Sequence, residues 1–121
     1  MVLFASGGDS LLLRAKYIGK TLVTDLEAKI EQEVVAWWTK RGGLQIKLNI
    51  LGRRGWPDRI FFPVGGKPVL IEFKRVNENA RALQAYVHGE LRARGYEVYV
   101  CDNANHGKAI LARSGLPERR G

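Results

Sequence analysis

The chain has 121 residues, enough for one domain with a hydrophobic core and too few for two. No apolar run approaches the roughly 20 residues that span a membrane, and Leu11-Leu12-Leu13 is too short for the core of a signal peptide. Its one cysteine, Cys101, excludes an internal disulfide framework and fits a reducing cytoplasm. The net charge of +8, spread along the chain, favours contact with a nucleic-acid backbone; a basic surface without a ligand is the alternative.

Residues 1–23 have no clear pattern and are interpreted as an N-terminal arm. A helix is predicted from Thr24 to about Arg41, because Thr24 and Glu27 match a capping box and Gly42-Gly43 follows an apolar stripe. On a helical wheel Glu31 lies about 100° from Ile30, between Trp38 and Val35, so it borders the buried arc. It is either a solvated surface glutamate or an acid that faces a site on the neighbouring sheet.

Strands are predicted at Leu44–Ile50, Arg59–Val64 and Lys67–Lys74, the last two joined through Gly65-Gly66. The first of these alternates apolar and polar residues, which is typical of a half-buried strand.

A helix follows from Asn77 to about Arg94, with an apolar stripe of Leu83, Tyr86, Val87 and Leu91, and Gly95 ends it. A strand at Glu97–Cys101, a short helix at His106–Arg113 and a basic tail complete the chain. The order α-β-β-β-α-β-α predicts an α/β domain over residues 24–113 with a mixed sheet, followed by the tail at 114–121.

The chemistry concentrates in Gly55-Trp56-Pro57-Asp58-Arg59 and Val69-Leu70-Ile71-Glu72-Phe73-Lys74. Side chains alternate along a strand, so Glu72 and Lys74 share one face. They share it with Asp58 only if the hairpin has an odd loop or a bulge, since a one-residue slip reverses every side chain. We therefore predict a three-residue loop, Gly65 to Lys67, that pairs Asp58 with Lys74. Two carboxylates and a lysine so placed suit a hydrated Mg²⁺ that also binds a phosphate.

The ordered set of motifs resembles the VRR-NUC family (virus-type replication-repair nucleases) of the PD-(D/E)XK superfamily, over roughly residues 27–102. It comprises Lys29-Ile30-Glu31, Gly42-Gly43, Lys47, Arg53-Arg54-Gly55-Trp56-Pro57-Asp58-Arg59, Ile71-Glu72-Phe73-Lys74, Gln84, Leu91 and Gly95. The resemblance implies a restriction-endonuclease-like fold and a DNA endonuclease. A chain of this kind looks like the stand-alone, phage-encoded modules of the family, acting in a bacterial cytoplasm.

The resemblance also implies roles for individual residues. Asp58 and Glu72 would ligate Mg²⁺ or Mn²⁺ with the Phe73 carbonyl, and Glu31 would ligate directly or through a water. Lys74 would orient or deprotonate the attacking water, or stabilise the phosphorane. Gln84 would lie beside the site. Zinc is disfavoured because His88 and His106 are lone histidines, expected at the surface or in helix packing.

Lys47, Arg53, Arg54, Arg59 and Arg75 are the candidates for DNA contact, and Trp56 either stacks on a base or closes the edge of the core. We expect branched DNA as substrate, a homodimer, no membrane and no nucleotide cofactor. A non-catalytic nucleic-acid-binding module is the main alternative, and a small-molecule phosphodiesterase is a third. Apolar residues at Leu11–Leu13, Tyr17-Ile18 and one of Trp37 or Trp38 suggest a dimer interface; an arm folded over its own sheet would leave a monomer.

Overall fold

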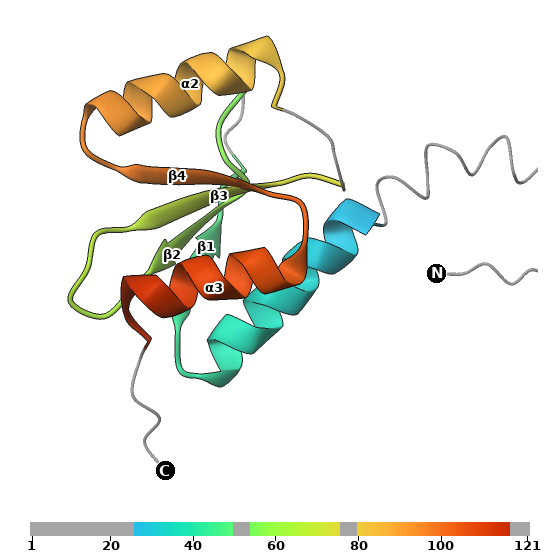
Figure 1. Cartoon of the computed structure of the whole chain (residues 1–121), viewed down its shortest axis with the longest axis vertical. Helices are drawn as coiled ribbons and strands as arrows, with labels where there is room; N and C mark the ends of the chain where they lie inside the picture. Colours follow the sequence, from blue (N-terminus) through green and yellow to red (C-terminus); the bar gives the residue numbers. More distant parts are fainter. Residues whose placement is uncertain (1–25, 50–53, 76–79, 117–121) are drawn as a thin grey trace, which may run out of the picture.

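The computed structural model describes residues 26–49, 54–75 and 80–116, which form a four-stranded mixed sheet between helices (Figure 1). The sheet order is β1-β2-β3-β4, from Leu44–Lys47, Arg59–Phe62, Val69–Phe73 and Glu97–Cys101. The first three strands are antiparallel neighbours, whereas β4 runs parallel to β3. A parallel pair needs a crossover, which helix α2 (Ala82–Ala93) supplies. The predicted α/β class and element order are confirmed.

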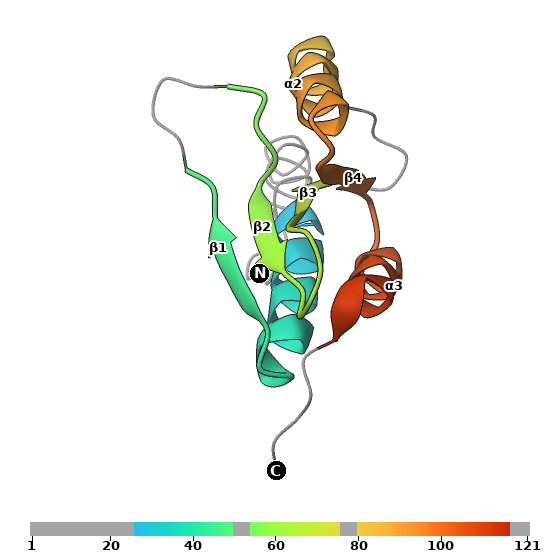
Figure 2. The same ribbon diagram turned by 90° about the vertical axis from the view of Figure 1, so that its left-hand side faces the viewer.

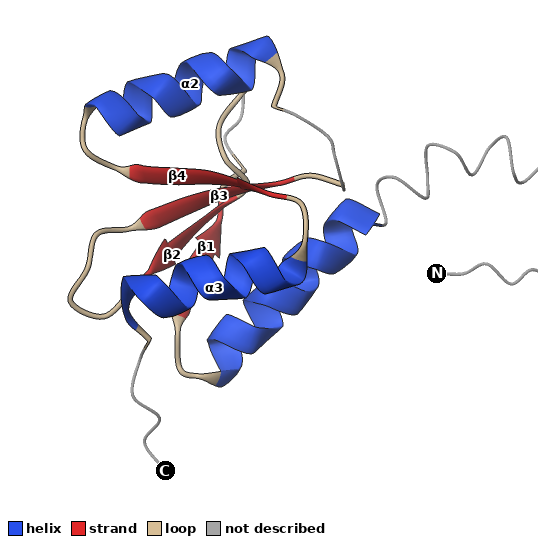
Figure 3. Ribbon diagram, viewed as in Figure 1, coloured by secondary structure: helices blue, strands red, loops and turns tan. Residues whose placement is uncertain are grey.

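One face of the sheet carries the hydrophobic core, beneath the helix at residues 26–40 and helix α3 (Ala104–Gly115), as Figure 3 shows. The core consists of Val34, Trp38, Phe61, Val69, Ile71, Phe73, Cys101, Ile110 and Leu111. Trp38 donates from its indole to the Leu44 carbonyl at 2.9 Å and meets Phe61 edge-on. A side chain at Gly43 would come within 2.4 Å of that indole, so this turn requires glycine. Trp37 packs against the same core and lies under Arg41. Both tryptophans are therefore used within the fold, and the suggestion from the sequence that one of them belongs to a dimer interface is wrong.

Among the described residues, the other face is covered by α2, which packs on β4 and reaches Glu72 of β3, and Figure 2 shows β1 at the far edge of the sheet. Leu44 is 66% exposed and Ile46 is 49% exposed, so the prediction of a half-buried first strand is wrong. Their register with β2 places them on the α2 face, beyond the reach of that helix.

Helix α2 also differs from its prediction. It begins at Ala82 with Arg81 as N-cap; residues 76–79 lie outside the described part. Leu83 and Tyr86 of the expected apolar stripe are 49% and 65% exposed, and the buried residue is His88. The helix therefore turns Gln84 and His88 toward Glu72 of the sheet, while Val87 and Leu91 of the predicted stripe are half-buried.

Two prolines set the ends of the β2–β3 hairpin. Proline has no N–H for a strand ladder, so β2 ends at Phe62 before Pro63 and β3 begins at Val69 after Pro68. Both strands are shorter than predicted for this reason. Helix α3 is longer than predicted because Asn103 caps it, its side chain accepting from the His106 amide at 2.7 Å. No helix in the described ranges is long and apolar enough to cross a membrane.

Candidate active site

The hairpin register places the two acids of the motif opposite each other. Arg59 pairs with Ile71 and Ile60 with Leu70, so Asp58, one residue before β2, falls opposite Glu72. The predicted pairing of Asp58 with Lys74 is wrong by two residues. A two-residue shift preserves the side-chain alternation, however, and Asp58 and Glu72 share the α2 face as required.

Asp58 ends the ladder between the two strands. Its amide donates to the Ile71 carbonyl at 3.0 Å, and its Oδ2 accepts from the Phe73 amide at 2.8 Å. The carboxylate thus takes the place of a main-chain partner beside Pro57. Burial raises the pKa of Asp58 above its ordinary value of 3.8, although the Phe73 amide and the charge of Lys47 oppose the rise.

Glu72 is the most perturbed group of the site. It is 4% exposed, and its Oε2 accepts from the Gln84 side chain at 3.1 Å. Burial raises its pKa from 4.5 to about 8, and the charge of Asp58 adds to the rise while Lys74 opposes it. Its Oε1 is buried without a hydrogen-bond partner, 4.0 Å from His88 Nε2, which is also unpartnered. Glu72 therefore holds a proton at neutral pH unless a cation approaches Oε1.

Lys74 lies beside Glu72 just beyond the end of β3. Its amide continues the parallel ladder by donating to the Cys101 carbonyl at 2.9 Å. The ammonium group is 3.7 Å from Glu72 Oε2, and the residue is only 6% exposed. The structure thus brings Asp58, Glu72 and Lys74 together in one partly enclosed site.

Gln84 ties the first turn of α2 to this site. Its Oε1 accepts from the Arg81 amide at 2.9 Å, completing a capping box, while its Nε2 holds Glu72. The expectation that Gln84 lies beside the site agrees with that geometry.

Glu31 lies on the helix at residues 26–40, under the opposite face of the sheet from α2. Its Oε2 accepts from Lys47 Nζ at 2.8 Å and from Arg59 Nε at 2.5 Å. Its charge nevertheless helps to raise the pKa of Asp58, so the two carboxylates are close enough to interact. Glu27, one helical turn earlier, contributes in the same way to the pKa of Glu72. From the sequence, Glu27 was predicted only to cap the helix; its i, i+4 spacing from Glu31, which puts both acids on one helix face, was the signal for a second role.

The basic candidates divide into two groups. Arg54 and Arg75 are exposed near the two ends of the motif. Lys47 and Arg59 already pair with Glu31, with side chains 49% and 20% exposed. Arg53 lies outside the described residues.

His88 lies beside the acid site, although the sequence predicted only a surface or helix-packing role for it. It is 1% exposed, because it stands on the side of α2 that faces Glu72, and burial lowers its pKa below 6.5. No sequence pattern distinguishes it from His106, which is exposed. Cys101 is buried at the end of β4, and burial raises the pKa of its thiol.

The acidic part of the site consists of the carboxyl groups of Asp58 and Glu72, and Oε1 of Glu72 has no hydrogen-bond partner. Within the described ranges, no three His, Cys, Asp or Glu side chains converge as a ready-made metal centre. Mg²⁺ keeps several waters and needs only one or two carboxylates, so Asp58 and Glu72 Oε1 fit it better than they fit zinc.

Two comparisons with known proteins indicate the same class, whereas a scan against models of protein families finds no match. The chain is 36% identical over 77 residues to "Putative nuclease p44" of Acyrthosiphon pisum secondary endosymbiont phage 1, an alignment covering 64% of this chain and 83% of that protein. A solved "VRR_NUC domain" superposes with a TM-score of 0.64 at 25% identity, covering 71% of this chain and 94% of that one.

Fold, site and relatives together define a nuclease domain of the PD-(D/E)XK type. Within that class, the chain belongs to the VRR-NUC family.

Proposed function

We propose that this protein is a divalent-metal-dependent DNA endonuclease that hydrolyses phosphodiester bonds and selects DNA by structure, a four-way junction or a flap. The observation that carries the proposal is Glu72, buried beside Asp58 with an unpartnered Oε1 and a pKa raised to about 8. Two neighbouring buried carboxylates are costly for a fold, and a bound cation removes that cost.

Mg²⁺ or Mn²⁺ would be held by Asp58, Glu72 and the Phe73 carbonyl, with Glu31 ligating directly or through a water. When bound, the ion would stabilise negative charge on a phosphate oxygen and lower the pKa of a water. The hydrogen bond from Gln84 fixes Oε2 of Glu72 and leaves Oε1 as the oxygen available to the cation.

We assign Lys74 a direct role in the reaction. Its ammonium lies 3.7 Å from Glu72 and would orient a water against the phosphorus or offset charge on the pentavalent phosphorane. The water oxygen forms a bond to phosphorus while the bond to the leaving sugar oxygen breaks, and that oxygen takes up a proton.

DNA would approach along the basic side of the site. Arg54 and Arg75 are exposed close to the acids in sequence, and Lys47, Arg53 and Arg59 would extend the contact. Phosphate contacts of this kind fix the position of the duplex without reading its sequence. We expect the action to take place in the cytoplasm of a bacterial host.

A homodimer would suit paired incisions in a branched DNA, because this chain has the residues of one such site and one site cuts one strand. Leu44 and Ile46 form an exposed apolar surface on β1 that supports an interface. Leu11–Leu13 and Tyr17-Ile18 lie outside the described residues. Light scattering at micromolar concentration separates a dimer from a monomer of 13.6 kDa. A monomeric mass, with a junction nicked on one strand only, would refute the dimer.

The nuclease proposal is tested with labelled linear, flapped and four-way DNA, incubated with Mg²⁺, with Mn²⁺ or with EDTA. We expect metal-dependent cutting that is lost in Asp58→Ala, Glu72→Ala and Lys74→Ala, with DNA binding retained. Binding without cutting in any metal would instead support a non-catalytic nucleic-acid-binding module.

A further inference from the structure

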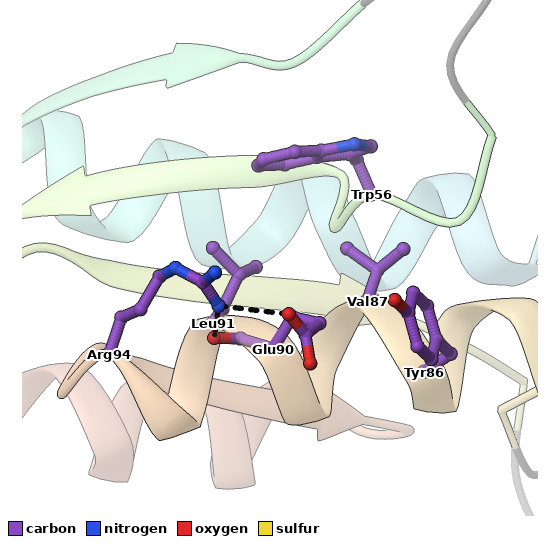
Figure 4. A pocket seen from close by; sticks show the side chains of 6 residues that line it. All are labelled: Trp56, Tyr86, Val87, Glu90, Leu91 and Arg94. Carbon is purple, nitrogen blue, oxygen red and sulfur yellow. Dashed lines mark hydrogen bonds and ion pairs between the residues drawn. The ribbon is translucent and has the colours of Figure 1, made fainter.

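A cavity of about 320 Å³ lies between the loop that precedes β2 and helix α2. It is lined by Trp56, Tyr86, Val87, Glu90, Leu91 and Arg94. In Figure 4 the Trp56 side chain lies across from the helix, and Val87 and Leu91 point toward it. The cavity is therefore a slot with an aromatic wall on one side and an aliphatic wall on the other.

The sequence fixes this slot through a close packing of loop and helix. Gly55 has a positive φ of 87°, and a side chain there would come within 2.9 Å of Leu83 and 3.1 Å of Val87. The loop can approach α2 this closely only with glycine, and the approach sets Trp56 over the helix.

Trp56, Val87 and Leu91 of the slot are half-buried, and the apolar surface at its edge is open to solvent. Tyr86 is 65% exposed and Leu83 beside it is 49% exposed, although both stand on a helix whose polar face is buried. At the far end, Arg94 and Glu90 form an ion pair at 3.0 Å that offers a donor and an acceptor beside the apolar walls. A flat aromatic ring with a polar edge matches that combination.

The slot is next to the proposed site of cutting. Trp56 precedes Asp58 by two residues, which separates their Cα atoms by at most about 7 Å. The slot and the acid site also share helix α2, because Gln84 of that helix donates a hydrogen bond to Glu72. A base in the slot would therefore belong to a nucleotide close to the scissile phosphate.

We propose that the slot binds one unpaired nucleobase of the DNA substrate, stacked on Trp56, and that this contact selects DNA with an unpaired nucleotide beside the cut. Paired bases are stacked on their neighbours and cannot enter a side pocket without flipping out. Stacking on an aromatic side chain is tolerant of base identity, so the slot reads structure rather than sequence. This inference rests on the proposed DNA endonuclease function.

The test compares two duplexes that differ in one unpaired nucleotide, which either carries adenine or is abasic. With Mg²⁺, the wild-type kcat/KM is expected to be about tenfold higher for the adenine duplex, the scale of one stacked base. Trp56→Ala should bring that ratio close to one, and Trp56→Phe should retain part of it. Tyr86→Ala alters an exposed side chain and should also lower the ratio. Tyr96→Ala removes an exposed tyrosine outside the slot and should leave it unchanged.

A binding measurement separates this inference from the endonuclease proposal. In EDTA, 2-aminopurine at the unpaired position should be quenched by the wild type and much less by Trp56→Ala. A wild type that cuts both duplexes equally, with quenching unaffected by Trp56→Ala, overturns the slot and leaves the nuclease standing. A wild type that cuts no DNA overturns the nuclease, and the quenching then decides whether the slot binds a base.

Discussion

Replacing Glu72 with glutamine tests the central electrostatic feature of the site. Glu72 has a pKa of about 8 in the folded protein against 4.5 ordinarily, so between these pH values the folded state keeps a proton that the unfolded state has lost. The free energy of unfolding must then fall as the pH rises from about 4.5 to about 8. At 1.36 kcal/mol per pH unit, the loss reaches about 3 kcal/mol at pH 7 and about 5 kcal/mol at full ionisation.

Glutamine has the same shape and cannot ionise, so Glu72→Gln should escape this loss. Glu72→Gln should not lose a strong ion pair with Lys74 at pH 7, because wild-type Glu72 is mostly protonated there and carries little negative charge. In EDTA we expect the variant to match the wild type near pH 4.5 and to exceed it by about 2–3 kcal/mol at pH 7.

Urea unfolding followed by circular dichroism at pH 5, 7 and 8 measures these differences. The control is Glu90→Gln, a surface glutamate that is expected to change stability by no more than about 0.5 kcal/mol at any of these pH values. Adding Mg²⁺ should raise the free energy of unfolding of the wild type and not that of Glu72→Gln. A cation that binds only the folded state stabilises that state, and the variant lacks the carboxylate that would hold it. A variant less stable than the wild type at pH 8 in EDTA, or equal stabilisation of both by Mg²⁺, would refute the reasoning.

Three further predictions concern the neighbours of Glu72. Glu31→Ala should reduce cutting substantially but less than Asp58→Ala; unchanged single-turnover rates would make Glu31 only a partner of Lys47 and Arg59. Glu27→Gln should remove a negative charge near Glu72 and move the rise of metal affinity with pH to lower pH, which calorimetric titration with Mg²⁺ at several pH values detects; an unshifted profile would exclude the interaction. Gln84→Ala should free Glu72 Oε2 and raise the Mg²⁺ concentration for half-maximal cutting several-fold, and a midpoint equal to the wild type would show that this hydrogen bond does not position the acid.

The sequence predicted those parts of the fold that local patterns determine. Strand Glu97–Cys101 was located to the residue, because alternation there follows a glycine stop. That Asp58, Glu72 and Lys74 share a face followed from strand alternation together with the requirement of the chemistry. The exact register did not follow, because the turn is centred on Gly65, whose φ is 73°, whereas the predicted loop Gly65 to Lys67 is centred on Gly66. The exposure of Ile46 depends on how far α2 reaches across the sheet, which no local pattern encodes.

The orientation of α2 is the difference with the most consequence for function. An amphipathic helix ordinarily buries its apolar stripe, and that rule placed Leu83 and Tyr86 against the sheet. The structure instead turns Gln84 and His88 inward, where Gln84 holds the carboxylate of Glu72 and His88 lies 4.0 Å from its other oxygen. Sequence rules fail most often where a protein trades stability for function. The same orientation points Val87 and Leu91 toward Trp56 and leaves Tyr86 exposed at the edge of the slot, so the polar contacts of the acid site and the aromatic slot beside it have one structural cause.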